Sequence, residues 1–280
     1  MSVVLDLTGR GGKAGARVGG RVLLVFALVL VVGCVDHGPA GLQRIADEAA
    51  ELRGGYGFLV AVIDGEGGRT VGIAGTDATG APLTEDVTWR IGSVTKAFVA
   101  VVTMQLVDEG HLSLDDLAAT CLDYDFIPAE ATILDLLHHS SGIPDYVENE
   151  EWVELMRSCP DEAPYPYDFV AEGPFIEPGS EWRYSNTNYL LLGEIIENVT
   201  GLPPETAIRH RILEPLGLSD TYTAYVETGR PPVLAVAAFF DDGPGPIECD
   251  TAPISGVPVV DMWANGGEEW LATRLSLCTT

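Results

Sequence analysis

The sequence predicts an α+β fold, in which strands and helices occupy separate stretches of the chain instead of alternating. Two apolar, β-branched segments, residues 58–64 and 70–74, are separated by a turn with three glycines, a pattern typical of a β-hairpin. From Ser93 onward, apolar residues recur at helical spacing. With 280 residues and 46% hydrophobic content, the chain is long enough to bury a sizeable core.

The strongest helical pattern covers residues 93–109. Gly110 follows directly, where a glycine commonly closes a helix. Ser93 stands at the start of the pattern, where serine is preferred as an N-cap or first-turn residue. Shorter helices are expected at residues 42–52, 131–139, 152–157, 187–199 and 204–213.

The first 33 residues have the pattern of an export signal. Four basic side chains precede an apolar run at residues 22–32, which is too short to span a membrane and has the length of a signal-peptide core. Gly33 and Cys34 follow at once, as in lipoprotein signals, whose cysteine becomes the lipidated first residue. A plain secretory signal or a short anchor is the alternative. We expect an exported periplasmic or cell-surface lipoprotein, anchored to a membrane through Cys34, with residues 34–44 as a linker.

The charge and the cysteines restrict the environment and the partners of the protein. A net charge of −27 repels phosphate backbones, so we expect no nucleic acid partner. Export would place the cysteines in an oxidising compartment. Besides Cys34 there are four cysteines, which allow three pairings among which the sequence does not choose: Cys121, Cys159, Cys249 and Cys278.

The histidines do not form the pattern of a metal site. His138 and His139 are adjacent, so on a helix they would point to different faces, and no third ligand is spaced to join them. No CxxC motif or cluster of histidine and cysteine occurs either. We therefore expect no metal and no other cofactor.

Ser93 and Lys96 form the first candidate catalytic pair. Residues three positions apart lie on one face of a helix, so the two side chains would project together. A serine hydroxyl becomes a nucleophile when a base removes its proton, and the field of a helix N-terminus favours the resulting alkoxide. A lysine can be that base when its surroundings lower its pKa, whereas an arginine cannot lose its proton. The sequence holds only two lysines, Lys13 and Lys96, and Lys13 lies in the predicted signal peptide.

A second motif, Tyr184-Ser185-Asn186, stands in a predicted loop just before the helix at 187–199. The hydroxyl of Tyr184 can relay a proton between Lys96, Ser93 and a leaving group. The amide of Asn186 can hold Lys96 and a carbonyl of the substrate. We therefore predict Ser93, Lys96 and Tyr184 as catalytic residues and Asn186 as a substrate-binding residue.

These motifs resemble those of the serine β-lactamase and penicillin-binding-protein family, in particular the branch of class C β-lactamases and D-Ala-D-Ala carboxypeptidases, which also contains esterases. Residues 89–98 look like the nucleophile helix of the family, and residues 136–143 are similar to its Leu-Leu-x-His-Thr-Ser-Gly-Leu segment. Residues 106–116 and 214–221 also fit. The resemblance covers about residues 45–267, for which it implies a domain of the β-lactamase and transpeptidase type.

The resemblance also implies roles for individual residues. Ser93 would be the acylated nucleophile, Lys96 its base partner and Tyr184 the proton carrier of the second motif. Asn186 would contact the substrate or hydrogen-bond within the site. His139 matches a position that packs a turn behind the site.

The third motif of the family, a Lys/His-Thr/Ser-Gly on an inner strand near the C-terminus, has no match. No lysine follows Lys96, and the last histidine is His210. In the family this strand also provides the second backbone N–H of the oxyanion hole. Residues 268–280 look unrelated to the family, so we expect a C-terminally truncated domain. Its antiparallel sheet would be incomplete and would leave an unpaired edge on the N-terminal hairpin.

Two hypotheses about function follow from this pattern. The first is a serine hydrolase that forms an acyl-enzyme with D-alanyl peptides, β-lactams or esters, so its partner would be a small molecule or a peptidoglycan peptide. The second is an inactive or binding-only homologue, anchored to the membrane by the lipidated Cys34. The set of Ser93, Lys96 and Tyr184 favours the first hypothesis, and the missing third motif favours the second. The sequence does not fix the oligomeric state.

Overall fold

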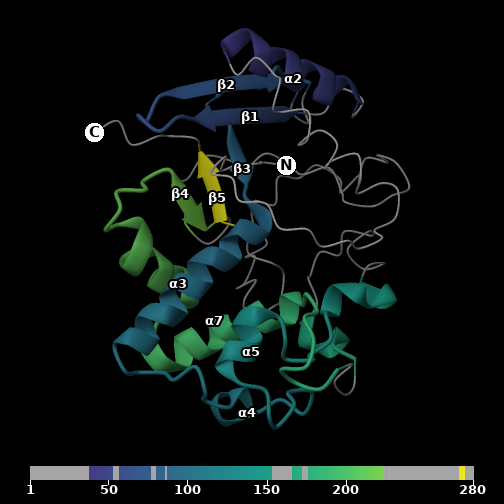
Figure 1. Cartoon of the computed structure of the whole chain (residues 1–280), viewed down its shortest axis with the longest axis vertical. Coiled ribbons are helices and arrows are strands. Elements are labelled where there is room, and N and C mark those ends of the chain that lie inside the picture. Colours follow the sequence, from purple (N-terminus) through teal and green to yellow (C-terminus); the bar gives the residue numbers. More distant parts are fainter. Residues whose placement is uncertain are drawn as a thin grey trace. The chain divides into compact units, whose positions relative to one another are not determined.

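A computed structural model describes residues 38–52, 57–76, 80–85, 87–152, 166–171, 176–223, 227 and 271–274. The chain divides into two compact units, Met1–Val87 and Thr88–Thr280 (Figure 1). The predicted signal peptide with Cys34, most of the helix predicted at 152–157 and three further cysteines lie outside the described residues. No described helix is long and apolar enough to cross a membrane.

The first unit is a β-hairpin with a helix packed along it (Figure 1). Strands β1 (Phe58–Ile63) and β2 (Arg69–Ala74) pair antiparallel, with Phe58 opposite Ala74. This confirms the predicted hairpin. Helix α2 (Pro39–Leu52) approaches β2 so closely that a Cβ on Gly72 would lie 2.2 Å from the carbonyl oxygen of Leu42. Only glycine fits this contact.

Helix α2 begins earlier than the sequence pattern predicts. Residues 39–41 are helical as well, although we expected the helix to begin at residue 42 after a linker that starts at residue 34. Leu42, Ala46 and Ala50 recur every four residues and are buried, so they form the apolar face of one continuous helix. Leu42 belongs to this face, and its burial makes the preceding turn part of the folded unit.

The second unit contains a three-stranded antiparallel sheet in the order β3-β5-β4 (Figure 1). Its strands are β3 (Thr88–Arg90), β4 (Thr221–Thr223) and β5 (Leu271–Arg274). The middle strand β5 comes from the segment 268–280, which we expected to be an unrelated tail. Four residues of this segment are therefore part of the fold.

The other elements described in the second unit are helices and helical turns. Its α-helices are α3 (Thr95–Asp108), α4 (Ala118–Cys121), α5 (Ile133–His138), α7 (Asn186–Thr200) and α8 (Pro204–Ile208). Short 3₁₀ turns are η2 (Gly92–Val94), η3 (Tyr146–Glu148) and η4 (Pro166–Phe169), and a π-helical turn, η5 (Arg209–Leu213), continues α8. The helices predicted around residues 93–109, 131–139, 187–199 and 204–213 are thus present with shifted ends.

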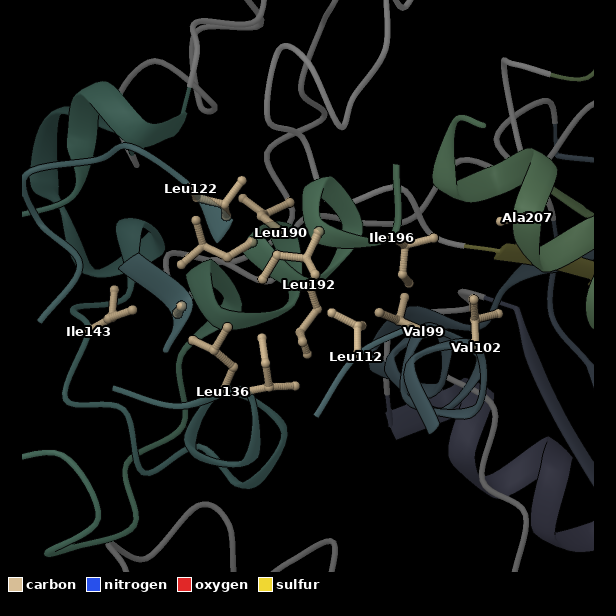
Figure 2. Packing of buried hydrophobic residues seen from close by; sticks show 14 of the residues in the cluster. Val99, Val102, Leu112, Leu122, Leu136, Ile143, Leu190, Leu192, Ile196 and Ala207 are labelled. Carbon is tan, nitrogen blue, oxygen red and sulfur yellow. The ribbon is translucent and has the colours of Figure 1, made fainter. Parts of the chain in front are cut away.

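Helix α7 forms the centre of the hydrophobic core of this unit. In Figure 2, Val99 and Val102 of α3 and Leu136 of α5 flank side chains of α7 that include Leu192 and Ile196. All five are at most 1% exposed. Burial of an aliphatic side chain of this size contributes about 1.5–3 kcal/mol. The core therefore fixes α3 and α7, the two helices that carry the motifs predicted from the sequence.

Candidate active site

Ser93 lies in the 3₁₀ turn η2, directly before α3. The N-cap of α3 is Val94, and no side chain caps the helix. Of the two positions predicted for Ser93, N-cap or first turn, the N-cap is therefore excluded. Its hydroxyl is exposed, and Ser93 Oγ lies 2.7 Å from Tyr184 Oη and 3.4 Å from Lys96 Nζ. Because it caps no backbone N–H, the hydroxyl can make both side-chain contacts.

Lys96 stands in the first turn of α3 and is half-buried. Its Nζ donates a hydrogen bond of 2.7 Å to Asn186 Oδ1. The same nitrogen lies 5.2 Å from the ring centre of Tyr184 and 5.7 Å from that of Tyr189, within the range of cation–π attraction. Ser93, Lys96, Tyr184 and Asn186, which the sequence predicts as site residues, therefore form one contiguous cluster. Their catalytic and binding roles stay predictions.

The ring of Tyr184 packs against His139, with 4.5 Å between the ring centres. His139 also lies 5.1 Å from the ring of Tyr189. The backbone N–H of Ser185 donates to His139 Nδ1 at 3.2 Å. His139 thus contacts the segment of the second motif through both its ring face and a ring nitrogen, behind the hydroxyl of Tyr184.

His139 ends helix α5 in the left-handed region, with a φ of 57°. It is the one residue other than glycine with a positive φ in the described part of the chain. Burial and the nearby charge of Lys96 lower the pKa of His139 to about 4. At neutral pH the ring is therefore uncharged, and Nδ1 is free to accept the hydrogen bond from Ser185.

Asn186 is the first residue of α7 and is 7% exposed. Its Nδ2 donates to Asp145 Oδ2 at 3.0 Å. Asp145 precedes the turn η3 and is also 7% exposed, and burial raises the pKa of its carboxyl group. The sequence reasoning missed this residue. The only local signal was its position, directly after the turn that ends at Pro144.

The geometry suits the activation of a hydroxyl for acyl transfer. Ser93 Oγ has a phenol on one side and an amine on the other, both candidates for moving its proton. The N-terminus of α3 lies next to it and favours developing negative charge. Within the described part of the chain, no group of histidine, cysteine, aspartate or glutamate side chains could hold a metal ion.

Comparison with known sequences gives one consistent family. The sequence model of the Beta-lactamase family matches residues 42–253. Penicillin-binding protein 4 of Amycolatopsis lactamdurans is 34% identical over 164 residues, which cover 54% of this chain and 40% of that protein. Esterase EstB of Burkholderia gladioli is 31% identical over 208 residues, which cover 65% of this chain and 50% of that protein. In these two comparisons the chain spans half or less of the relative's length.

Two solved structures have a similar fold. The D-amino acid amidase of Ochrobactrum anthropi SV3 has a TM-score of 0.55 and 32% identity, over 68% of this chain and 55% of that chain. A D-stereospecific amidohydrolase from Streptomyces sp. has a TM-score of 0.57 and 31% identity, over 70% of this chain and 60% of that chain. Since the family match covers more than half of the chain and includes Ser93, Lys96 and Tyr184, the protein belongs to the β-lactamase family.

Proposed function

We propose that the protein is a serine hydrolase that forms an acyl-enzyme on Ser93. The observation that carries this proposal is the position of Ser93 Oγ, 2.7 Å from Tyr184 Oη and 3.4 Å from Lys96 Nζ. An exposed serine hydroxyl between two groups that can take its proton is the arrangement that nucleophilic acyl transfer requires. Family membership supports the same reaction class.

In the proposed reaction, Ser93 Oγ forms a bond to the carbonyl carbon of the substrate. Its proton passes to Lys96 Nζ, directly or through Tyr184 Oη, while the carbonyl oxygen becomes an oxyanion. The bond between the carbonyl carbon and the leaving amine or alcohol then breaks, and the leaving group receives the proton. Water attacks the resulting ester of Ser93, releases the acid and restores the hydroxyl.

For the substrate, we propose D-alanyl peptides, β-lactams or esters, that is, small molecules or peptides of peptidoglycan. The similar proteins include penicillin-binding proteins, an esterase and a D-amino acid amidase, according to their names. Each name describes the relative and not this chain. Taken together, the names favour a substrate with an amide or ester carbonyl. In this reaction class, substrate choice depends on the groups that line the site beyond the nucleophile.

Labelling with a fluorescent penicillin tests the proposal on the full chain. We expect a covalent adduct on the wild-type protein and none on Ser93→Ala, because the alanine lacks the hydroxyl that is acylated. Ser113→Ala is the matched control, since the Ser113 hydroxyl is exposed and accepts a hydrogen bond from the nearby Asp115 N–H. This control should label as the wild type does.

Two further substrates distinguish the classes named above. Release of p-nitrophenol from its acetate ester and release of D-alanine from a D-alanyl-D-alanine peptide are measured on the same three proteins. The substrate with Ser93-dependent turnover identifies the class. Absence of a Ser93-dependent adduct or product with all three reagents would contradict the proposal and favour a protein that only binds.

A further inference from the structure

Asp145 is a buried carboxylate directly behind the site, and both of its oxygens accept hydrogen bonds. Oδ2 accepts from Asn186 Nδ2 at 3.0 Å, and Oδ1 accepts from the backbone N–H of Val147 at 3.3 Å. The backbone N–H of Asn186 also donates to this carboxylate. Asp145 is linked to the catalytic cluster through Asn186, whose amide also binds Lys96.

The carboxylate decides which end of the Asn186 amide faces Lys96. An amide has an oxygen that accepts and an NH₂ group that donates, and the two ends have nearly the same shape. An ionised carboxylate only accepts, so Nδ2 of Asn186 has to face Asp145 and Oδ1 has to face Lys96. With Asn186 only 7% exposed, water has little access to stabilise the opposite orientation.

The amide orientation in turn excludes one direction for the lone pair that Lys96 needs as a base. A neutral amine has one lone pair and two N–H bonds. One N–H of Lys96 Nζ donates to Asn186 Oδ1 at 2.7 Å, so the lone pair cannot point toward Asn186. The directions that remain include that of Ser93 Oγ, at 3.4 Å. A flipped amide would present its NH₂ group to Lys96 and attract the lone pair away from Ser93.

We propose that Asp145 is a positioning residue: through Asn186 it holds the amide oxygen against Lys96 and thereby directs the lone pair of Lys96 toward the Ser93 hydroxyl. This inference rests on the proposed function, because it concerns how Lys96 acts on Ser93. It extends the site by one buried residue that belongs to neither of the motifs found in the sequence.

Opposing effects act on the pKa of Asp145. Burial raises the pKa of Asp145, and the exposed Glu148 on η3 acts in the same direction, while the N–H donors of Asn186 and Val147 oppose the rise. Glu148 is itself paired with Arg183 at 2.7 Å. Asn186 in turn accepts a hydrogen bond from Lys96 of α3. The hydrogen bonds that Asp145 accepts favour its ionised, acceptor-only form, against the burial that raises its pKa.

A single variant, Asp145→Asn, and a double variant that exchanges the side chains of Asp145 and Asn186 test the proposal. Asp145→Asn offers one oxygen for three donors, the backbone N–H groups of Val147 and Asn186 and the Nδ2 of Asn186. Where its NH₂ group faces the side chain of Asn186, the amide of Asn186 flips. We expect acylation to slow about 10²-fold at neutral pH, as for a misplacement of about 1 Å at a reacting group. The double variant D145N/N186D restores the hydrogen bond with donor and acceptor exchanged, and it returns an oxygen to Lys96.

In D145N/N186D this oxygen belongs to a carboxylate, which favours the charged form of Lys96. We therefore expect acylation to recover at alkaline pH, with the acid limb of the pH profile moved up by about one unit or more. A purely structural role predicts instead that the double variant regains both the melting temperature and the original profile. Asp145→Ser is the matched control for the turn, because serine keeps an acceptor for the Val147 N–H but not for Asn186. It should melt near the wild type and acylate slowly.

A spectroscopic arm makes the test independent of activity. Since the chain contains only Lys13 and Lys96, lysine labelled with ¹³C at Cε gives a single resonance in a Lys13→Arg background. We expect the pH midpoint of this resonance to be lower in Asp145→Asn than in the background protein, because a flipped Asn186 amide presents its NH₂ group to Lys96. Equal midpoints, or wild-type acylation rates in Asp145→Asn, would overturn the inference. A wild-type protein that no substrate acylates would overturn the proposed function instead, and the midpoints would still decide the role of Asp145.

Discussion

At the residue scale, two hydrogen bonds behind the site each require one protonation state of a titratable side chain. His139 accepts from the Ser185 N–H only while its ring is uncharged, and Asp145 orients Asn186 only while its carboxylate is ionised. Burial acts on both, lowering the pKa of His139 to about 4 and raising that of Asp145. The second motif is thus held by two titratable groups that do not touch the nucleophile.

The state of His139 predicts that the fold loses stability in acid. Its pKa is about 4 in the folded protein, against 6.5 as the ordinary value. Well above pH 6.5 the ring is uncharged in both the folded and the unfolded chain. The uncharged ring then makes its full contribution to the free energy of unfolding. As the pH falls from 6.5 toward 4, the unfolded chain binds a proton that the folded chain does not, and the free energy of unfolding decreases. The loss is at most about 3 kcal/mol.

Urea unfolding at pH 7 and at pH 4.5 measures this loss, with His139→Asn as the comparison. Asparagine tolerates the left-handed backbone that the φ of 57° requires and does not titrate. We expect the difference between the two pH values to be smaller in the variant. The same difference in both proteins would show that other groups cause the loss.

At the element scale, helix α3 has ends of different construction. Its N-terminal end has no side-chain cap, which leaves the Ser93 hydroxyl to Tyr184 and Lys96. Its C-terminal end is closed fully: Gly110 N–H donates to the carbonyl of Val107, and the next N–H donates to that of Leu106. This is a Schellman motif, and it needs a residue in the left-handed region. The helix is therefore anchored at the end remote from the chemistry.

Gly110→Ala should destabilise the protein by about 1 kcal/mol. The φ of Gly110 is +76°, and a Cβ there would meet no atom within 4 Å, so the cost comes from the backbone conformation and not from a clash. Gly65→Ala is the matched control, because Gly65 also has no atom within 4 Å of a Cβ and lacks a positive φ. Denaturant midpoints of both variants check the prediction, which equal effects at the two positions would contradict.

At the scale of the whole molecule, we propose that a lipid on Cys34 anchors the protein to a membrane. The proposal rests on the basic region, the short apolar run and the Gly33-Cys34 junction of the sequence. A bound acyl chain adds about 0.8 kcal/mol of membrane affinity for each buried CH₂ group. An anchored enzyme would meet its substrate at the membrane surface.

Cys34→Ser should move the protein from the membrane fraction to the soluble fraction and abolish incorporation of radiolabelled palmitate. Fractionation of bacteria that express the full chain measures the first effect, and autoradiography measures the second. Cys121→Ser is the control, since Cys121 lies half-buried in the folded second unit at the end of α4. A Cys34→Ser protein that stays with the membrane would point to an anchor other than a lipid at this residue.

The sequence by itself determined the parts of the fold that depend on local patterns. The hairpin β1–β2, helix α3 with its closing Gly110 and helix α7 follow from the spacing of apolar residues and from turn chemistry, which act over a few positions. The same is true of Ser93 and Lys96, whose side chains meet because they are three positions apart at the start of one helix.

Tertiary structure alone decided which distant residues complete the site. Tyr184 reaches Ser93 across 91 positions, and Asp145 reaches Asn186 across 41 positions, distances at which hydrophobic periodicity carries no information. The motif resemblance anticipated the first contact, but no pattern indicated the second. The central place of β5 and the early start of α2 were missed for the same reason, because pairing and packing with remote segments define both. A short segment takes its structure from the partner that buries it.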